Sequence, residues 1–265
     1  MPYQMMLDAG HGGSDPGAVY QGRREKDDTL KLTLAIGEIL QESGIDVLYT
    51  RTTDVYLSPY ERAMEANQAG VDFFLSIHRN SYPTDNEVMG VESLVYDLSG
   101  LKYQVAREIA EQLEPVGFVD LGVKARPNLV VLRRTRMPAV LVEAGFINSN
   151  TDNEIFDANF QDIAQAIAAG VLDALENAGV LKIPESPAES DILKKEKYRI
   201  QVGIFRNRNN AMRFQEMLED QGFPAYVEQW KHYYRVISGE YETLDEAVMA
   251  QRRLQKAGFD TLVLQ

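Results

Sequence analysis

The chain has 265 residues, of which 45% are hydrophobic and 25% charged, and its formal net charge is −13 at pH 7. This composition is typical of a globular protein with a sizeable core, and the length allows one or two domains. No apolar run reaches the roughly 18 to 20 residues that cross a bilayer, so no membrane span is expected. The absence of cysteine excludes disulfides and thiolate metal sites, which leaves imidazole and carboxylate groups as metal ligands.

The net negative charge is confined to the first two thirds of the chain. Residues 1–180 carry 27 acidic and 14 basic side chains, whereas residues 181–265 carry 13 of each. Two domains of different character are therefore predicted. Neither has the basic surface that nucleic-acid binding requires, so no nucleic-acid partner is expected.

The N-terminal part alternates between strand-like and helix-like segments, which predicts an α/β domain with a mostly parallel central sheet flanked by helices. The expected strands are residues 4–7, 46–49, 73–77, 91–96, 128–132 and 139–142. The expected helices are residues 30–42, 59–67, 101–113 and 154–175. Capping boxes at residues 58–61 and 151–154 mark the starts of two of these helices.

Three of the expected strands lead into a residue that can bind a metal or transfer a proton. The first leads into His11, the third into His78 and the last into Glu143, while Glu25 stands just before the first helix. Catalytic groups of α/β proteins collect at the carboxyl ends of strands, so these four side chains can converge on one rim.

Two histidines and one glutamate form an established zinc ligand set that leaves the fourth position to water. His11, Glu25 and His78 can supply this set for one Zn²⁺ per chain, with Glu143 as general base. Zinc would lower the pKa of its water from 15.7 to about 7, and Glu143 would carry the proton to the leaving amine.

Each of these residues also has a simpler explanation. The glycine-rich loop around His11 could cradle a phosphate, although the Walker and Rossmann spacings are absent. His78 could be a hydrogen-bonded core histidine, Glu143 a helix-terminal acid, and Glu25 one of several available glutamates. Spacing alone leaves these alternatives open.

A linker is expected at residues 180–197, where helical periodicity stops at Gly179 and two prolines stand among small and acidic residues. It separates a domain at residues 1–179 from one at residues 198–265. Within the second domain, eight residues recur 36 positions later, starting with Tyr198 and Tyr234. Each repeat predicts strand, helix and strand. The tail is therefore expected to be a small α+β module of order βαββαβ, with two helices on one face of an antiparallel sheet.

Strand alternation assigns the faces of this second sheet. The face under the helices should hold Tyr198, Ile200, Val202, Tyr234 and Val236. The open face should hold Arg199, Gln201, Gly203, Tyr233, Arg235 and Ile237. Such a face suits a sugar chain, with Gln201, Tyr233 and Arg235 as candidate glycan contacts, but an ordinary solvated face fits the pattern as well.

A series of motifs in the first domain resembles the zinc-dependent N-acetylmuramoyl-L-alanine amidases of the amidase-3 family. The motifs occupy residues 7–18, 25–27, 50–54, 61–63, 76–78 and 142–146, in that order. The resemblance spans nearly all of residues 3–176. It implies that His11, Glu25 and His78 bind zinc, that Glu143 is the catalytic glutamate, and that the amide between N-acetylmuramic acid and L-alanine of the peptidoglycan stem peptide is cleaved.

The second domain resembles SPOR domains through residues 198–205 and 234–239. Those domains bind glycan strands stripped of peptide. The two resemblances together predict a peptidoglycan hydrolase that is anchored to glycan strands. The alternatives are a noncatalytic wall-binding or regulatory protein on the same fold and a zinc hydrolase that acts on another amide.

Arg79 departs from the family pattern, in which a small residue commonly follows the histidine. We expect it to alter the substrate groove or to contact a stem-peptide carboxylate, and Asn80 and Arg126 are further candidates for substrate binding. The segment 89–102 shows no long helical insertion of the kind that plugs some relatives.

The protein is expected to be a monomer that acts on the bacterial cell wall. The sequence starts directly with a strand and shows no signal peptide. An amidase with a SPOR domain and no leader resembles lysins that are released from the mother-cell cytoplasm when a spore-forming cell lyses, and a phage endolysin would also lack a leader. If a leader has been removed, secretion is expected instead.

Overall fold

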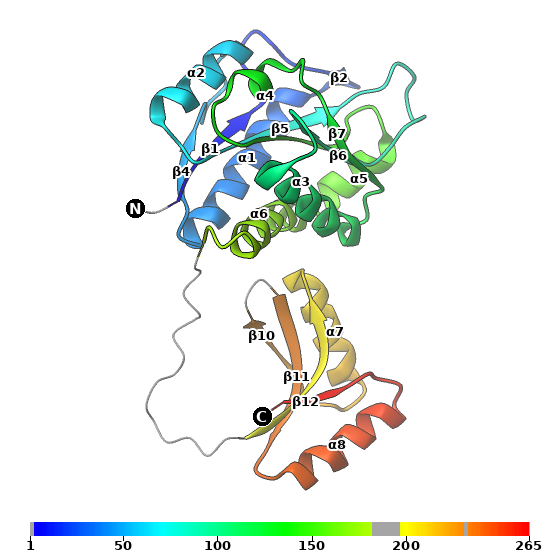
Figure 1. Cartoon of the computed structure of the whole chain (residues 1–265). Coiled ribbons are helices and arrows are strands. Elements are labelled where there is room, and N and C mark those ends of the chain that lie inside the picture. Colours follow the sequence, from blue (N-terminus) through cyan, green and yellow to red (C-terminus); the bar gives the residue numbers. More distant parts are fainter. Residues whose placement is uncertain (1–2, 182–196, 231–232, 265) are drawn as a thin grey trace. The chain divides into compact units, whose positions relative to one another are not determined.

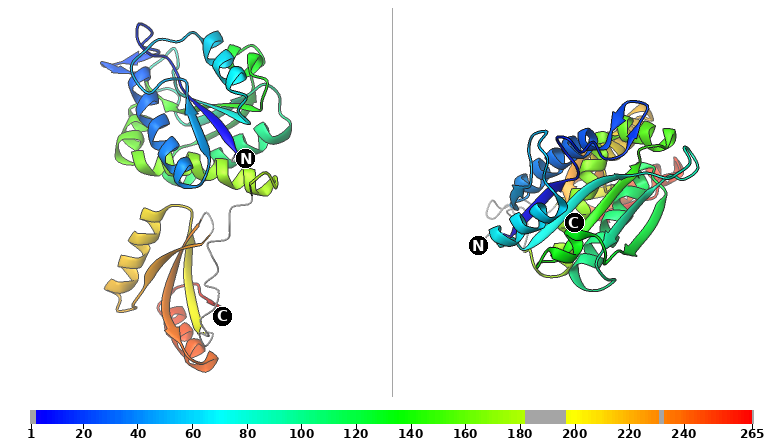
Figure 2. Two further views of the ribbon diagram at one scale, coloured as in Figure 1. Left: turned by 90° about the vertical axis from the view of Figure 1, so that its left-hand side faces the viewer. Right: turned by 90° about the horizontal axis from the view of Figure 1, so that it is seen from above.

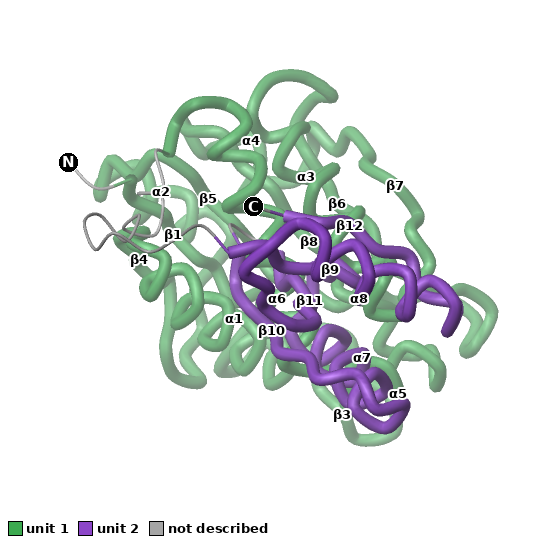
Figure 3. Tube along the Cα trace, turned by 90° about the horizontal axis from the view of Figure 1, so that it is seen from below, with its two compact units in different colours: residues 1–183 green, residues 184–265 purple. Residues whose placement is uncertain are grey.

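The computed structural model describes residues 3–181, 197–230 and 233–264. The chain forms two compact units, Met1–Ile183 and Pro184–Gln265, which are described separately (Figures 1 and 3). The division between them falls inside the predicted linker at 180–197, most of which lies outside the described residues. None of the described helices combines the length and apolar character of a transmembrane segment.

The first unit is built on a six-stranded sheet. Its order is β4 (Asp46–Tyr49), β1 (Gln4–Ala9), β5 (Phe73–Asn80), β8 (Ala139–Phe146), β6 (Val91–Val95) and β7 (Asp120–Ala125). The first four strands are mutually parallel, β6 is antiparallel to β8, and β7 is parallel to β6. The predicted mostly parallel α/β sheet is confirmed.

Helices cover both faces of this sheet (Figures 1 and 2). The larger apolar cluster joins one face to α1 (Glu25–Glu42), α3 (Gly100–Leu113) and α6 (Phe160–Asn177). A smaller cluster joins the other face to α2 (Pro59–Ala69) and α4 (Val130–Arg134). Of β8, this cluster contains Ala139 and Leu141 but not Glu143, which stands further along the strand.

A hairpin, a 3₁₀ turn and a short helix complete the first unit. A hairpin of β2 (Val19–Tyr20) and β3 (Arg23–Arg24) leads directly into α1. A 3₁₀ turn, η1 (Glu114–Val116), follows α3, and α5 (Asn150–Ala158) follows β8.

Local sequence explains the start of α2 but not the division between α5 and α6. Ser58 and Glu61 form the expected capping box, and Pro59 occupies the first turn of α2. The single helix expected over residues 154–175 is wrong, because the chain leaves the helical conformation at Asn159 (φ −118°, ψ 28°). Ser149, rather than Thr151, caps α5 by accepting a hydrogen bond from the Asp152 N–H.

The strand expected at residues 128–132 is also wrong. This part of the chain turns after β7, where the Leu129 N–H donates to the Arg126 carbonyl, and then forms α4. Val131 and Leu132 are buried in the smaller cluster. A short apolar run fits a buried helix as well as a buried strand, so the sequence could not distinguish the two.

The second unit is the predicted βαββαβ module. It contains, in chain order, β9 (Tyr198–Phe205), α7 (Arg208–Asp220), β10 (Tyr226–Trp230), β11 (Tyr233–Tyr241), α8 (Leu244–Lys256) and β12 (Leu262–Leu264). The sheet order is β10-β11-β9-β12, with every pair antiparallel.

The predicted faces of the second sheet are confirmed in part. Ile200, Val202 and Val236 are buried in the core with the helices. A register shift in the β9–β11 pairing turns Gly203 towards the helices, where an added Cβ would lie 2.6 Å from the Phe205 ring, so its assignment to the open face is wrong. Ile237, which pairs with Gln201, was also expected on the open face, but it is fully buried.

Candidate metal centre

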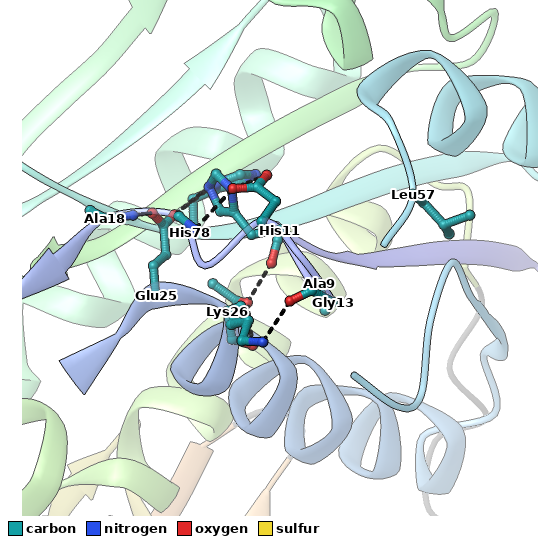
Figure 4. A network of polar contacts seen from close by, with 12 residues as sticks. Ala9, His11, Gly13, Ala18, Glu25, Lys26, Leu57 and His78 are labelled. Carbon is teal, nitrogen blue, oxygen red and sulfur yellow. Dashed lines mark hydrogen bonds and ion pairs between the residues drawn. The ribbon is translucent and has the colours of Figure 1, made fainter. Parts of the chain in front are cut away.

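His11, Glu25 and His78 meet at one edge of the first sheet (Figure 4). His11 follows β1, Glu25 begins α1 and His78 lies near the end of β5. Glu25 Oε1 is 3.2 Å from His11 Nε2 and 2.9 Å from His78 Nδ1. One ligand atom from each residue lies within 4.8 Å of the other two, so the three can bind one ion.

Two glycines allow the backbone to pass close to these side chains. A Cβ on Gly10 would lie 2.4 Å from His78 Cε1, and one on Gly17 would lie 2.6 Å from Glu25 Oε2. Gly17 also has a φ of 66°, a conformation that costs glycine little. Substitution of either glycine would push a ligand side chain out of place.

Two buried arginines hold the loop that carries His11. Arg51 donates to the Ala9 carbonyl at 2.8 Å and to the Gly10 carbonyl at 2.9 Å. Arg62 donates to the carbonyls of Ala9 and His11, both at 2.6 Å. Both arginines belong to motifs recognised in the sequence, but spacing gave no indication that they hold this loop.

Further contacts orient the ligands themselves. Asp15 Oδ2 lies 2.8 Å from His11 Nδ1, which directs Nε2 of the same ring towards Glu25. Glu25 Oε2 accepts a hydrogen bond from the Ala18 N–H at 2.9 Å. Asp15 was not predicted as a site residue, although an acid four positions after a candidate ligand is a usable signal.

The three ligand groups influence one another's protonation. Burial lowers the pKa of His11, but hydrogen bonds and charges from Glu25 and Asp15 outweigh this and raise it to about 9. Burial likewise opposes protonation of His78, yet Glu25 raises the pKa of this residue too. Burial alone would raise the pKa of Glu25, but the two imidazoles hold it far below its ordinary value. A cation that binds here must therefore displace protons.

Glu143 stands beside this group, directly opposite His78 on the neighbouring strand. Its Oε2 atom is buried and has no hydrogen-bond partner within the described part of the chain. Burial raises the pKa of Glu143 to about 7; His78 opposes this shift, and the charges of Glu25 and Glu92 add to it. A carboxyl group with this pKa can both accept and donate a proton near neutrality.

The donor chemistry fits zinc. Two imidazoles and one carboxylate are a common set for a zinc site that keeps a position for water. Glu143, which pairs with His78 across the neighbouring strands, adds a carboxylate whose buried Oε2 has no hydrogen-bond partner among the described residues. The residues present are therefore those that a hydrolytic zinc site needs.

Comparison with known families identifies both units. Residues 5–173 match the family model described as N-acetylmuramoyl-L-alanine amidase, and residues 194–265 match the SPOR domain. The chain belongs to the N-acetylmuramoyl-L-alanine amidase family. This amidase thus combines a peptidoglycan amidase unit with a SPOR cell-wall-binding unit.

Individual relatives of the amidase agree with the family match. The chain is 37% identical over 229 residues to the sporulation-specific N-acetylmuramoyl-L-alanine amidase of Bacillus subtilis (strain 168), covering 84% of each protein. It is 34% identical over 233 residues to the N-acetylmuramoyl-L-alanine amidase CwlM of Bacillus licheniformis, again covering 84% of each. The crystal structure of an N-acetylmuramoyl-L-alanine amidase from Clostridium difficile 630 matches with a TM-score of 0.62 at 32% identity, covering 66% of this chain and 97% of that one.

Arg79 of the amidase was predicted to face the substrate, but its side chain points into the protein. Its side chain is buried, donates to Asp28 at 2.6 Å and to Asn153 at 2.7 Å, and lies 4.1 Å above the Phe156 ring. These contacts leave the guanidinium no access to a bound peptide. The predicted contact with a stem-peptide carboxylate is therefore wrong.

Asn80 and Arg126, the other candidates for substrate contact, lie in different places. Asn80 is half-buried and donates to Glu92 at 2.9 Å, next to Glu143. Arg126 is exposed just after β7, and the strand register places this end of β7 beside the start of β8. The structure thus places Asn80 against Glu92, the neighbour of Glu143, and Arg126 near the start of β8, away from Glu143.

The candidate glycan contacts lie on the second sheet. Gln201, Tyr233 and Arg235 are all partly buried, and the Arg235 guanidinium lies 3.6 Å from the centre of the Trp230 ring. Their contact with glycan stays a prediction.

Proposed function

We propose that this protein is a zinc-dependent amidase of the bacterial cell wall. It cleaves the bond between N-acetylmuramic acid and L-alanine of the peptidoglycan stem peptide. The observation that carries the proposal is the convergence of His11, Glu25 and His78 beside the unpartnered Oε2 of Glu143. The family match and the names of the relatives support the choice of substrate.

In this proposal His11, Glu25 and His78 hold one zinc ion, and Asp15 fixes the ring of His11. Zinc in such a set lowers the pKa of a water molecule to about 7 and polarises the scissile carbonyl. Glu143 accepts a proton from the attacking water through Oε2. It then donates that proton to the nitrogen of L-alanine as the carbon–nitrogen bond breaks, a contribution of about 10²- to 10⁴-fold to the rate.

The second unit is proposed to bind glycan strands through the face that carries Gln201, Tyr233 and Arg235. The match to the SPOR domain and the exposed ring of Trp230, which lies against Arg235, support the assignment. Tethering of the first unit to the wall would then raise its local substrate concentration. The complete ligand set and the buried base do not favour a noncatalytic wall-binding protein.

The test is to digest purified peptidoglycan with the wild type and with Glu143→Ala, and to measure the metal content of both. One zinc ion per chain in both proteins is expected, with peptides bearing an N-terminal L-alanine released by the wild type alone. Activity in Glu143→Ala would reject Glu143 as the base. A metal-free, inactive wild type would favour the wall-binding alternative.

A further inference from the structure

A row of polar side chains leads away from the metal centre across neighbouring strands. His78 on β5 pairs with Glu143 on β8, and Glu143 pairs with Glu92 on β6. Phe74, Leu94 and Leu141 stand an even number of positions from these residues in the same strands, so they point to the same face of the sheet. They pack against α2 and α4, and the row therefore lies on the face that these helices cover. With strands about 4.8 Å apart, the row extends roughly 10 Å from His78 towards β7.

Lys124 of β7 reaches the end of this row. Its Nζ forms an ion pair with Glu92 Oε2, and the other oxygen of Glu92 accepts a hydrogen bond from Asn80. Both carboxylate oxygens of Glu92 are therefore engaged, and Glu92 holds the ammonium group in place. An ammonium group has three donors, and Glu92 accepts from one of them.

Lys124 also differs in exposure from the cations around the metal centre. Its side chain is 39% exposed. The side chains of Lys26 and Arg62 are 6% and 4% exposed and bind Asp54 and Asp8, respectively. Arg79 is completely enclosed. Lys124 is thus a cation fixed by the protein that can still reach a ligand.

We propose that Lys124 binds a carboxylate of the stem peptide, two or three residues from the cleaved bond. The inference rests on the proposed function. In the bound substrate, the peptide would then lie over β8, β6 and β7, and the glycan would lie on the other side of the metal centre. Two or three extended residues span roughly 7 to 11 Å, which matches the length of the row.

Charge supports this orientation. Stem peptides carry carboxylates, whereas the glycan beside the cleaved bond offers hydroxyl and acetamido groups. Residues 1–180 carry a net charge of −13, so most of the unit's surface repels a peptide carboxylate. A fixed ammonium beside the base offers the compensating attraction on the peptide side.

The test compares two disaccharide peptides, one with free stem carboxylates and one with these groups amidated. The variants are Lys124→Met and Lys124→Arg, with Lys102→Met as the matched control. Lys102 is also ion-paired, but its partner is Asp97, near the start of β8, instead of Glu92.

The wild type is expected to prefer the free-acid substrate. Lys124→Met should lower kcat/KM for that substrate about 10- to 100-fold, the range for a hydrogen bond between charged groups, and mainly through KM. Its kcat/KM for the amidated substrate should stay near the wild-type value. Lys124→Arg should retain most of the preference, and Lys102→Met should match the wild type on both substrates.

Removal of Lys124 leaves Glu92 buried without its partner, so the double variant Glu92→Gln/Lys124→Met is tested as well. It should lose the preference for free carboxylates in the same way. Equal losses on both substrates, or a wild type without preference, would overturn the role of Lys124 while leaving the proposed function intact. A wild type that releases peptide from neither substrate would overturn both.

Discussion

Arg79 links the strand that carries His78 to the helix that carries Glu25. Its backbone N–H donates to Glu25 Oε1 at 3.1 Å, and its guanidinium donates to Asp28, one turn further along α1. Arg23 donates to the same oxygen of Asp28 at 2.6 Å. Arg79, which departs from the family pattern, therefore supports the metal ligand Glu25 and the helix that carries it, instead of facing the substrate.

We predict that Arg79→Ala destabilises the protein and weakens zinc binding. The free energy of unfolding should fall by about 3 kcal/mol, because Asp28 loses a buried partner and the shortened side chain leaves a cavity. Zinc affinity should fall about 10- to 100-fold, as is usual when a group that supports a metal ligand is removed. Denaturant unfolding and competitive zinc titration measure the two effects.

Arg24→Ala is the control for this variant, because Arg24 pairs with Asp27 at the protein surface at the start of the same helix. It should leave both quantities close to wild type. If Arg79→Ala lost stability at unchanged zinc affinity, Arg79 would have no part in positioning the ligands.

Asp15 provides a second prediction at the residue scale. Asp15→Ala should lower zinc affinity about 10- to 100-fold, because the ring of His11 loses the partner of Nδ1 and can rotate. Asp15→Asn keeps an acceptor at this position and should have a smaller effect. Zinc titration of both variants, with Asp27→Ala as control, makes the comparison; equal affinities in all three would contradict the assignment.

The four residues proposed for the centre of the site could be chosen from the sequence, because each follows an expected strand or precedes an expected helix within a recognisable motif. The sequence could not predict the orientation of Arg79. That side chain is drawn inward by Asp28 and by Phe156, a ring 77 positions away in the chain. The roles of Arg51 and Arg62 depend in the same way on carbonyl groups more than 40 positions distant.

At the scale of secondary-structure elements, Asp8 joins β1 to three of its neighbours. Its carboxylate accepts hydrogen bonds from Thr50 after β4, Arg62 of α2 and Ser76 of β5, at 2.6 to 2.7 Å. Burial alone would raise the pKa of Asp8, but the charge of Arg62 and these hydrogen bonds outweigh it and hold the pKa below its ordinary value.

This shift sets the direction of a pH dependence. The unfolded chain binds a proton at Asp8 near pH 4, and the folded protein does so only at lower pH. The stability that Asp8 contributes is therefore present above about pH 4 and is lost as the pH falls through the folded value. Asp8→Asn should be about 3 to 5 kcal/mol less stable than the wild type at pH 7, and the difference should shrink below pH 4.

Denaturant unfolding of both proteins at pH 7, 5 and 3, with chelator present throughout, isolates the effect of Asp8. The chelator prevents metal loss at low pH from contributing to the difference. A gap in stability that is the same at pH 7 and pH 3 would contradict the assignment.

The elements themselves were predicted where periodicity and caps agree, as at α2 and in the repeated second unit. Prediction failed where one contact from a distant segment determines the result. Asn159 ends α5 and donates to the Val116 carbonyl, which lies 43 positions earlier. In β9 the register shift beside Gly203 reverses the expected face, and strict alternation cannot anticipate such a shift.

At the scale of the whole molecule, each unit has an apolar core of its own. Among the residues that the structure describes, the clusters of the first unit contain none beyond position 181, and the cluster of the second contains none before position 200. The two units are therefore expected to fold separately, with different tasks.

Removal of residues 181–265 should weaken binding to intact sacculi and leave the cleavage of small soluble muropeptides largely unchanged. The separate second unit should retain sacculus binding without releasing peptide. Co-sedimentation with sacculi and chromatography of soluble products measure the two activities. Loss of both activities to the same extent in the truncated protein would contradict the division of labour.

The positions of the three ligands along the chain make a bound ion a cross-link. Glu25 follows His11 by 14 residues, and His78 follows Glu25 by 53. One ion would thus close two loops of the chain, and it would stabilise the folded protein by about 4 kcal/mol at a free zinc concentration of 1,000 times Kd. The melting temperature should rise with zinc in the wild type and equally in Glu143→Ala, since Glu143 closes neither loop. Thermal unfolding with zinc and with chelator would thus distinguish the three ligands, which cross-link the chain through the ion, from Glu143, which takes part in the reaction alone.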